Sequence, residues 1–298
     1  MADRVTLRPT VEEAAAAYRE LVLANRAAIE AIEGERPPGD DYWASRASSF
    51  RPGRTPLPEL GVLLALAQPG DTWLDIGAGA GRFAVPLAGH VGRVVAVEPS
   101  PSMREGLAEA AREAGRGNIT VIDLTWPPSM AGAVPDADVS LAANVLYAVD
   151  EPLGFLLAME RHTRRTCVVV AFDRAPNTPI PGLWRELWGS DFRELPALRE
   201  LLALLLAMGR RVRVEPLPPQ RFEPRPLDDV AADFAWMYHV RPGIGDFEAK
   251  LGRFRELVAK YCGTGEGLAL PPVVRRYPSV VSWPPEWSGA EMSAMEQG

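Results

Sequence analysis

Apolar positions along the chain change their spacing at definite points, and these changes predict the order of helices and strands. From Thr10 onward, apolar residues recur at helical spacing until Gly34, and Thr10 with Glu13 forms a capping-box signature. A second short apolar helix is expected over residues 59–67, after a stretch rich in arginine, serine and proline. Residues 1–69 are therefore predicted to be a helical N-terminal segment.

Between residues 70 and 175 short runs rich in β-branched residues alternate with helical stretches. Strands that alternate with helices at this spacing are typical of βαβ units, which build a parallel sheet with helices on both faces. The strands are expected at 72–76, 93–98, 119–123, 138–143 and 166–172, with helices at 82–88, 101–114 and 152–164.

After the fifth strand the alternation becomes irregular. A leucine-rich helix is predicted over 196–208, a strand over 211–217 and a last strand over 277–283. These strands would complete a doubly wound, seven-stranded α/β sheet, one of the pair being antiparallel. The predicted organisation is a helical lid (1–69), a core (70–217), a helical insertion over the carboxyl ends of the strands (218–276), and the last strand with a tail (277–298).

Composition narrows the class of protein. Of 298 residues 47% are apolar and 24% charged, which suits a globular protein with an ample core. The net charge of −7 argues against a broad basic surface for nucleic acid. Two cysteines and three histidines make a metal site or a disulfide framework an unfavoured interpretation. With neither a leader pattern nor an apolar run long enough for a membrane, a cytoplasmic protein without membrane partners is expected.

One segment carries the candidate chemistry: WLDIGAGAGR, residues 73–82. Glycine stands at every second position of a turn between a strand and a helix, and glycine allows both positive φ and close approach to a ligand. The unpaired N–H groups at the start of the helix face the same place. The next strand ends in Glu98, roughly 20 residues on, where a carboxylate can accept the hydroxyl hydrogens of a ribose. The loop therefore suits an anionic or zwitterionic small molecule.

These residues carry a family resemblance. The run Leu74–Gly81 resembles motif I of the class I S-adenosylmethionine-dependent methyltransferases. Residues 95–100, 121–123 and 138–147 are similar to the motifs at the second, third and fourth strands of that family. The matches occur in the family's order over about residues 70–175. The resemblance implies a Rossmann-like fold and S-adenosylmethionine as the cofactor.

The resemblance also implies roles for the residues of the glycine loop. Gly77, Ala78 and Gly79 would wrap the methionine part of the cofactor. Asp75 would brace the turn, to which Gly81 also belongs.

At the next two strands the implied contacts are with the nucleoside. Glu98, followed by Pro99 in the same motif, would bind the ribose hydroxyls. Met103 would lie against the adenine. Asp123 would accept a hydrogen bond from the adenine amino group, with the Leu124 backbone beside it.

The remaining candidates concern the methyl group and the acceptor. The residues from Asn144 to Tyr147 would border the methyl group, and Tyr147 is a catalytic candidate. His239 would act as a general base if the insertion folds over the pocket; the alternative is a surface or core histidine on a helix rich in aromatic residues. Trp43 and Arg46 would close over the cofactor carboxylate.

Two other functions, an NAD(P)-dependent dehydrogenase and a non-catalytic binding protein, are alternatives to a methyltransferase. A dehydrogenase that uses NAD(P) would need G-x-G-x-x-G, but Arg82 stands where the third glycine belongs, and both lysines lie beyond residue 249. A non-catalytic protein that only binds S-adenosylmethionine remains open.

No Asn/Asp-Pro-Pro-aromatic motif follows the fourth strand, which favours a small-molecule acceptor with an oxygen or nitrogen nucleophile over nucleic acid. The aromatic residues over 180–260 would suit an apolar acceptor or the core of a cap, and the oligomeric state is left open.

Overall fold

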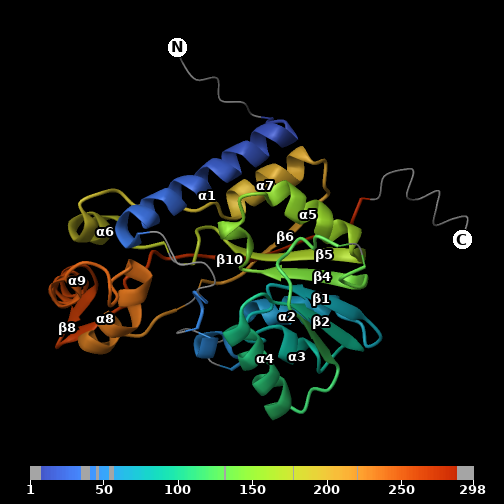
Figure 1. The fold of residues 1–298 in the computed structure, drawn as a ribbon, viewed down its shortest axis with the longest axis horizontal. Helices are drawn as coiled ribbons and strands as arrows, with labels where there is room; N and C mark the ends of the chain where they lie inside the picture. The colour runs from blue at the N-terminus through green and yellow to red at the C-terminus, as the bar shows by residue number, and fades with distance from the viewer. Residues whose placement is uncertain are drawn as a thin grey trace, which may run out of the picture.

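The fold is built on a central sheet of seven strands, in the order β3-β2-β1-β4-β5-β10-β6 (Figure 1). The computed structural model describes residues 8–34, 41–44, 47–53, 57–130, 132–176, 178–219 and 221–286. β10 runs antiparallel to both of its neighbours, β5 and β6, and the other neighbouring strands pair in parallel, as expected when one of the last two strands is antiparallel. The strands are β1 (Thr72–Ile76), β2 (Arg93–Val97), β3 (Ile119–Ile122), β4 (Ala137–Ala143), β5 (Thr163–Phe172), β6 (Arg213–Pro216) and β10 (Pro278–Trp283).

Helices cover both faces of the sheet because successive strand residues point to opposite sides. Leu74 and Ile76 pack in the cluster that includes α5 and α7, whereas Trp73 packs in the cluster beneath α2, α3 and α4. The predicted doubly wound α/β architecture is therefore confirmed. These helices are α2 (Pro58–Leu66), α3 (Ala84–Leu87), α4 (Pro101–Glu113), α5 (Pro152–Arg161) and α7 (Leu198–Ala207), with the short 3-10 turns η1 (Ala47–Phe50) and η2 (Leu146–Ala148).

The N-terminal helix α1 (Val11–Glu33) begins with the predicted capping box, in which Thr10 and Glu13 exchange hydrogen bonds. Its first half packs through Ala14 on the cluster that α5 and α7 share. Its last turns pack through Ile29 and Ile32 on a separate aromatic cluster. Helix α1 thus packs along α7 and α5, whereas η1 contacts α4 on the other side of the sheet (Figure 1).

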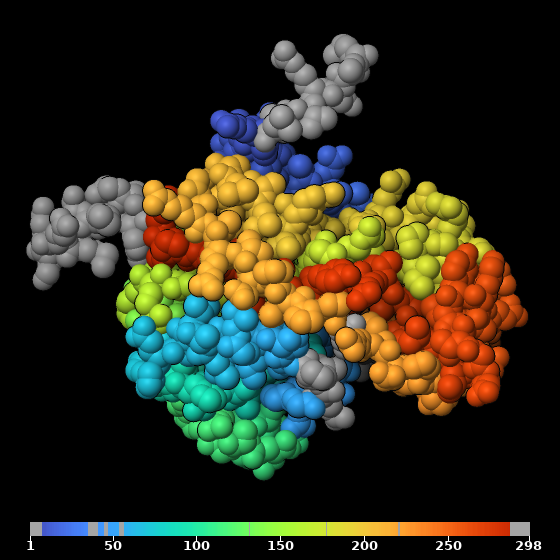
Figure 2. Space-filling view, turned by 180° about the vertical axis from the view of Figure 1, so that it is seen from behind, coloured from blue at the N-terminus to red at the C-terminus, as the bar shows by residue number. Residues whose placement is uncertain are grey.

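The aromatic cluster is the core of a smaller body, here called the cap, beside the carboxyl ends of the strands (Figures 1 and 2). Trp184, Tyr238 and Phe254 are fully buried at its centre. The insertion was expected to be helical, but it also holds a three-stranded sheet, and α6 joins it from before β6. The cap consists of α6 (Pro181–Trp188), β7 (Arg225–Pro226), α8 (Leu227–Ala235), η3 (Trp236–Tyr238), α9 (Phe247–Cys262), β8 (Gly263–Gly265) and β9 (Leu268–Ala269).

The predicted boundary between α5 and β5 is wrong. The helix expected to reach residue 164 ends at Arg161, and β5 begins at Thr163. Thr163 is fully buried and donates to Met159 O at 2.6 Å, while its hydroxyl also lies 2.6 Å from Ser140 Oγ. This β-branched residue therefore ends the helix and pairs with β4. Among the described helices none is long and apolar enough to cross a membrane.

A buried ion pair connects α5 to the segment before β6. Arg210 donates from Nε and Nη2 to the two carboxylate oxygens of Glu160, at 2.7 Å each, and Trp283 Nε1 donates to the same carboxylate at 2.8 Å. The Arg210 and Glu160 side chains are only 11% and 5% exposed.

We expect Arg210→Met to lower the free energy of unfolding by about 3 kcal/mol, because it leaves a buried carboxylate without its cation. Urea denaturation measures the change. Arg213→Met is the matched control: the Arg213 side chain is 77% exposed and pairs with Glu215, so its loss should cost less than about 1 kcal/mol. Equal losses in the two variants would contradict this account of the pair.

Candidate functional site

The glycine loop between β1 and α3 depends on backbone that only glycine adopts readily. Gly77, Gly79 and Gly81 have φ of 70°, 55° and 84°. A Cβ on Gly77 would lie 2.7 Å from a methyl carbon of Val145, and one on Gly81 would lie 2.8 Å from a methyl carbon of Val85. The loop therefore has no room for a side chain at Gly77 or Gly81.

The loop is tied to the neighbouring strand through its own amides. The backbone N–H groups of Gly77 and Ala78 donate to Val97 O at 2.8 and 3.2 Å. Because Val97 ends β2, these bonds bring the loop next to Glu98. Met103 lies below it, with its sulfur 3.8 Å from the place of a Gly79 Cβ.

Asp75 lies at the end of β1 under this loop and is 2% exposed. Its Oδ2 is buried without a hydrogen-bond partner in the described part of the chain. Burial, with a smaller contribution from the negative charge of Glu98, raises the pKa of Asp75 to about 7. A buried carboxylate oxygen without a donor is uncommon, and a positively charged ligand group would satisfy it.

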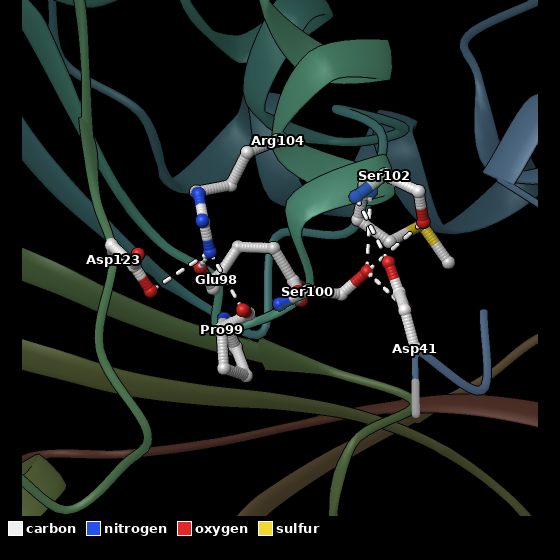
Figure 3. A network of polar contacts seen from close by, with 8 residues as sticks. Asp41, Glu98, Pro99, Ser100, Ser102, Arg104 and Asp123 are labelled. Carbon is white, nitrogen blue, oxygen red and sulfur yellow. Dashed lines mark hydrogen bonds and ion pairs between the residues drawn. The ribbon is translucent and has the colours of Figure 1, made fainter. Parts of the chain in front are cut away.

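Glu98 connects the loop to the start of α4. Its Oε1 accepts from Ser100 N at 2.9 Å (Figure 3). Its Oε2 accepts from Gly79 N at 2.8 Å, and the residue is 6% exposed. Burial raises the pKa of Glu98, although the two amides act in the opposite direction. A carboxylate has about four acceptor positions, so capacity remains for two hydroxyl groups of a ligand.

Arg104, which the sequence analysis did not single out, joins the ends of β2 and β3. Its Nη1 donates to Glu98 O at 3.1 Å, to Pro99 O at 2.6 Å and to Asp123 Oδ1 at 2.8 Å (Figure 3). The Asp123 side chain is 68% exposed. Asp123 was expected to accept a hydrogen bond from the adenine amino group, and one of its carboxylate oxygens already accepts from Arg104. Leu124, next in the chain, packs its side chain on the α5 and α7 cluster.

Asp41 attaches the N-terminal segment to the same place. Its Oδ2 accepts from Ser102 N at 3.0 Å, and its Oδ1 accepts from Ser100 Oγ at 2.9 Å (Figure 3). This carboxylate therefore sits at the N-terminus of α4, where the helix dipole favours a negative charge.

Aromatic rings then join this segment to the cap. The ring of Trp43 lies 5.4 Å from Phe50 and 6.2 Å from Trp236, and Tyr42 lies 5.0 Å from Trp236, between ring centroids. Trp43 thus lies between η1 and the cap, and its contact with the cofactor stays a prediction. Arg46, its predicted companion, lies outside the described residues.

Asn144 and Tyr147 form one hydrogen-bonded unit after β4. Asn144 has a φ of 60°, a left-handed conformation uncommon for residues other than glycine. Its Oδ1 accepts from the Tyr147 hydroxyl at 3.1 Å, and that hydroxyl accepts from Phe172 N at 2.8 Å. Tyr147 is 7% exposed, and burial raises the pKa of its hydroxyl. The geometry therefore suits a residue that positions Asn144 better than it suits a base.

His239 lies in the cap and contacts the end of α1. Its Nδ1 is 2.6 Å from Glu33 Oε1, and Arg241 pairs with the other oxygen of Glu33 at 2.8 Å. The imidazole ring also packs edge-on against Trp184. Of the two interpretations that the sequence left open, these contacts favour a histidine that joins α1 to the cap.

A second buried carboxylate near the loop was missed by the sequence analysis. Glu59, in the first turn of α2, is 5% exposed, and its Oε2 has no partner among the described residues. Burial raises the pKa of Glu59, and attraction by Arg82 opposes that shift. Arg82 follows Gly81 directly. A cation at this position of the loop was the sequence signal that could have pointed to a buried carboxylate nearby.

Comparisons with known proteins agree with this geometry. A family model described as a methyltransferase domain matches residues 74–169. An uncharacterized protein of Haemophilus influenzae is 38% identical over 77 residues, 26% of this chain and 28% of that protein. A probable cobalt-precorrin-6B C(15)-methyltransferase (decarboxylating) of Methanothermobacter thermautotrophicus is 30% identical over 96 residues, 31% of this chain and 50% of that protein.

The chain thus spans half or less of the length of these curated relatives. Among solved structures, a putative methyltransferase from Bacillus halodurans has a TM-score of 0.50 at 13% identity, over 81% of this chain and 100% of the other. That likeness is one of fold. With the motif order and the strand order described above, this match supports the predicted resemblance of residues 74–169 to the class I S-adenosylmethionine-dependent methyltransferases, whose cofactor is S-adenosylmethionine.

Proposed function

We propose that this protein binds S-adenosylmethionine and transfers its methyl group to a small-molecule acceptor. The observation that carries the proposal is Asp75, a buried carboxylate with an oxygen that no described residue satisfies, under a loop that excludes side chains. A ligand with an ammonium and a sulfonium group supplies the positive charge that this position lacks.

The residues around Asp75 fit the rest of the cofactor. Gly77, Ala78 and Gly79 are proposed to wrap its amino-acid part, with open space at Gly79, where a Cβ would contact only the Met103 sulfur at 3.8 Å. Glu98 retains acceptor positions for its ribose hydroxyls. Met103, 4% exposed, presents an apolar surface at the adenine end. At that end Asp123 and Leu124 are proposed contacts, the former with the oxygen that Arg104 does not use.

When bound, the cofactor supplies an electrophilic methyl carbon on a positively charged sulfur. The chain contributes alignment, which accounts for much of the rate in such displacements. Asn144 is held at the end of β4 by Tyr147, and Tyr147 by Phe172 N, so this unit is proposed to border the methyl group. In this scheme His239 maintains the position of the cap through Glu33.

The proposed nucleophile is an oxygen or nitrogen of the acceptor. Each presents a lone pair to the methyl carbon, and a general base is needed only where the acceptor must first lose a proton. A small molecule is favoured over nucleic acid because the chain carries a net charge of −7 and its cap is rich in aromatic rings.

The proposed function is tested by ligand binding and by product formation. We expect S-adenosylhomocysteine to raise the melting temperature, and NAD(P) to leave it unchanged. Methylated product, followed by mass spectrometry over a panel of phenols, amines and carboxylic acids, distinguishes an enzyme from a protein that only binds the cofactor. Stabilisation by NAD(P) alone would instead support the dehydrogenase.

We expect Glu98→Ala to weaken S-adenosylhomocysteine binding by about 1–3 kcal/mol, because the ribose loses a charged acceptor. Isothermal titration calorimetry measures the change. Glu105→Ala, an exposed residue of α4, is the matched control and should bind as the wild type does. An unchanged affinity in Glu98→Ala would refute the ribose assignment.

The affinity for S-adenosylhomocysteine should fall as the pH is lowered from 8 to 6. Asp75, with a pKa of about 7 in the free protein, takes up a proton over this range and loses the charge that attracts the ligand's ammonium group. Below pH 7 the loss should approach about tenfold per pH unit. Asp75→Asn should bind more weakly and with a flat profile; a wild-type profile that is already flat would contradict the assignment.

The same carboxyl affects the stability of the free protein in the opposite direction. Its pKa in the folded state exceeds the usual value of 3.8, so the folded protein loses stability as the pH rises from about 4 through 7. In urea denaturation, Asp75→Asn should therefore be more stable than the wild type at pH 8.

A further inference from the structure

Arg276 lies where the cap returns to the sheet. It stands two residues before β10, and because β10 is antiparallel, its start lies at the carboxyl ends of β4 and β5. The next residue, Tyr277, exchanges hydrogen bonds with Asp173: Tyr277 N donates to Asp173 Oδ1 at 2.6 Å, and Asp173 N donates to Tyr277 O at 3.1 Å. The backbone of Arg276 is therefore fixed at the edge where ligands of such sheets bind.

The guanidinium group of Arg276 is held on one side and lacks partners on the other. Its central carbon lies 5.0 Å from the centroid of the Phe172 ring, and Nη1 donates to Pro176 O. Nε is buried without an acceptor in the described part of the chain. The Nε–Nη2 edge, which binds carboxylates through two parallel hydrogen bonds, therefore makes no hydrogen bond to a described residue.

This guanidinium also has no carboxylate within ion-pair distance in the parts of the chain that the structure describes. Burial lowers the pKa of Arg276, and the positive charge of Arg82 acts in the same direction, while Tyr147 and Asp173 oppose the shift. A partly buried cation without a counter-charge in contact is costly. The position therefore favours an anionic ligand group.

The contacts of Arg276 place it near the proposed methyl site. Phe172, beneath its guanidinium, donates through its backbone N–H to Tyr147, whose hydroxyl donates to Asn144. The glycine loop follows β1, and β5 is two strands away in the sheet, about 10 Å at the usual spacing between strands. Arg276 is thus displaced from the loop that accommodates the amino-acid part of the cofactor, toward the side where an acceptor approaches.

We propose that Arg276 binds a carboxylate group of the methyl acceptor through its Nε–Nη2 edge, with the ring of Phe172 supporting the guanidinium. This inference rests on the proposed function and names the class of its substrate: small molecules that carry a carboxylate. The other source of the same chemistry is the carboxylate of the cofactor itself, and the experiment separates the two.

The test compares charged probes with neutral ones on protein saturated with S-adenosylhomocysteine. Benzoate and phenylacetate are titrated beside benzamide and phenylacetamide, and binding is followed by the melting temperature and by ligand-observed NMR. We expect the wild type to bind the carboxylates at least tenfold more tightly than the amides. Arg276→Gln should abolish this preference, and Arg276→Lys should retain part of it.

Arg275→Gln is the matched control, because Arg275 is exposed and packs on the Tyr277 ring. It should keep the wild-type preference for carboxylates. S-adenosylhomocysteine should bind Arg276→Gln with unchanged affinity, which also shows that the variant is folded.

Two results would overturn the inference. If the wild type does not distinguish the carboxylates from the amides, no anionic group is recognised. If Arg276→Gln loses affinity for S-adenosylhomocysteine tenfold or more while 5′-methylthioadenosine, which lacks the carboxylate, binds as before, Arg276 serves the cofactor instead. A wild type that binds no S-adenosylhomocysteine would refute the proposed function itself, which keeps the two failures distinct.

Discussion

Two carboxylates buried at the ends of adjacent strands are the constraint on which the site depends. Asp75 lies in β1 opposite Ala96 of β2, and Glu98 directly follows β2. The charge of Glu98 adds to burial in raising the pKa of Asp75. Glu98 is stabilised by the amides of Gly79 and Ser100, which fixes both the glycine loop and the start of α4. Asp75 has no such compensation for its second oxygen. A positively charged ligand would offset the repulsion between the two carboxylates and would bind the unpaired oxygen of Asp75. The electrostatic cost of the free site therefore favours binding.

The position of the cap is linked to this site by contacts between distant parts of the chain. Asp41 binds the first turn of α4, beside Glu98, and the adjacent rings of Tyr42 and Trp43 pack on Trp236 of the cap. On the opposite side Glu33 joins α1 to His239 and Arg241. The cap is therefore held by the core through the N-terminal segment as well as through its own chain connections. The cap is therefore fixed in position relative to the proposed cofactor site. An acceptor bound between cap and core would contact this fixed surface of the cap.

The antiparallel strand explains why a residue so late in the sequence lies beside the proposed site. A parallel strand at the place of β10 would begin at the opposite edge of the sheet, and residues before it would lie far from the glycine loop. Because β10 runs the other way, Arg276 arrives at the end of β5, above Phe172 and close to the unit formed by Tyr147 and Asn144. The insertion that forms the cap therefore also delivers a cation to the proposed acceptor side.

By itself the sequence determined the features that depend on near neighbours: the capping box at Thr10, the strand positions from β1 to β4, the glycine loop and the Ser100 cap of α4. Backbone preference and hydrophobic period act over a few residues, so their signals are readable in order along the chain. Only the tertiary structure decided the partners of Asp41, Arg104 and Arg276, and the contact of His239 with Glu33, which spans 206 residues. A side chain records its charge and size in the sequence but not its distant neighbour, because that neighbour is set by how the whole sheet and the cap pack together.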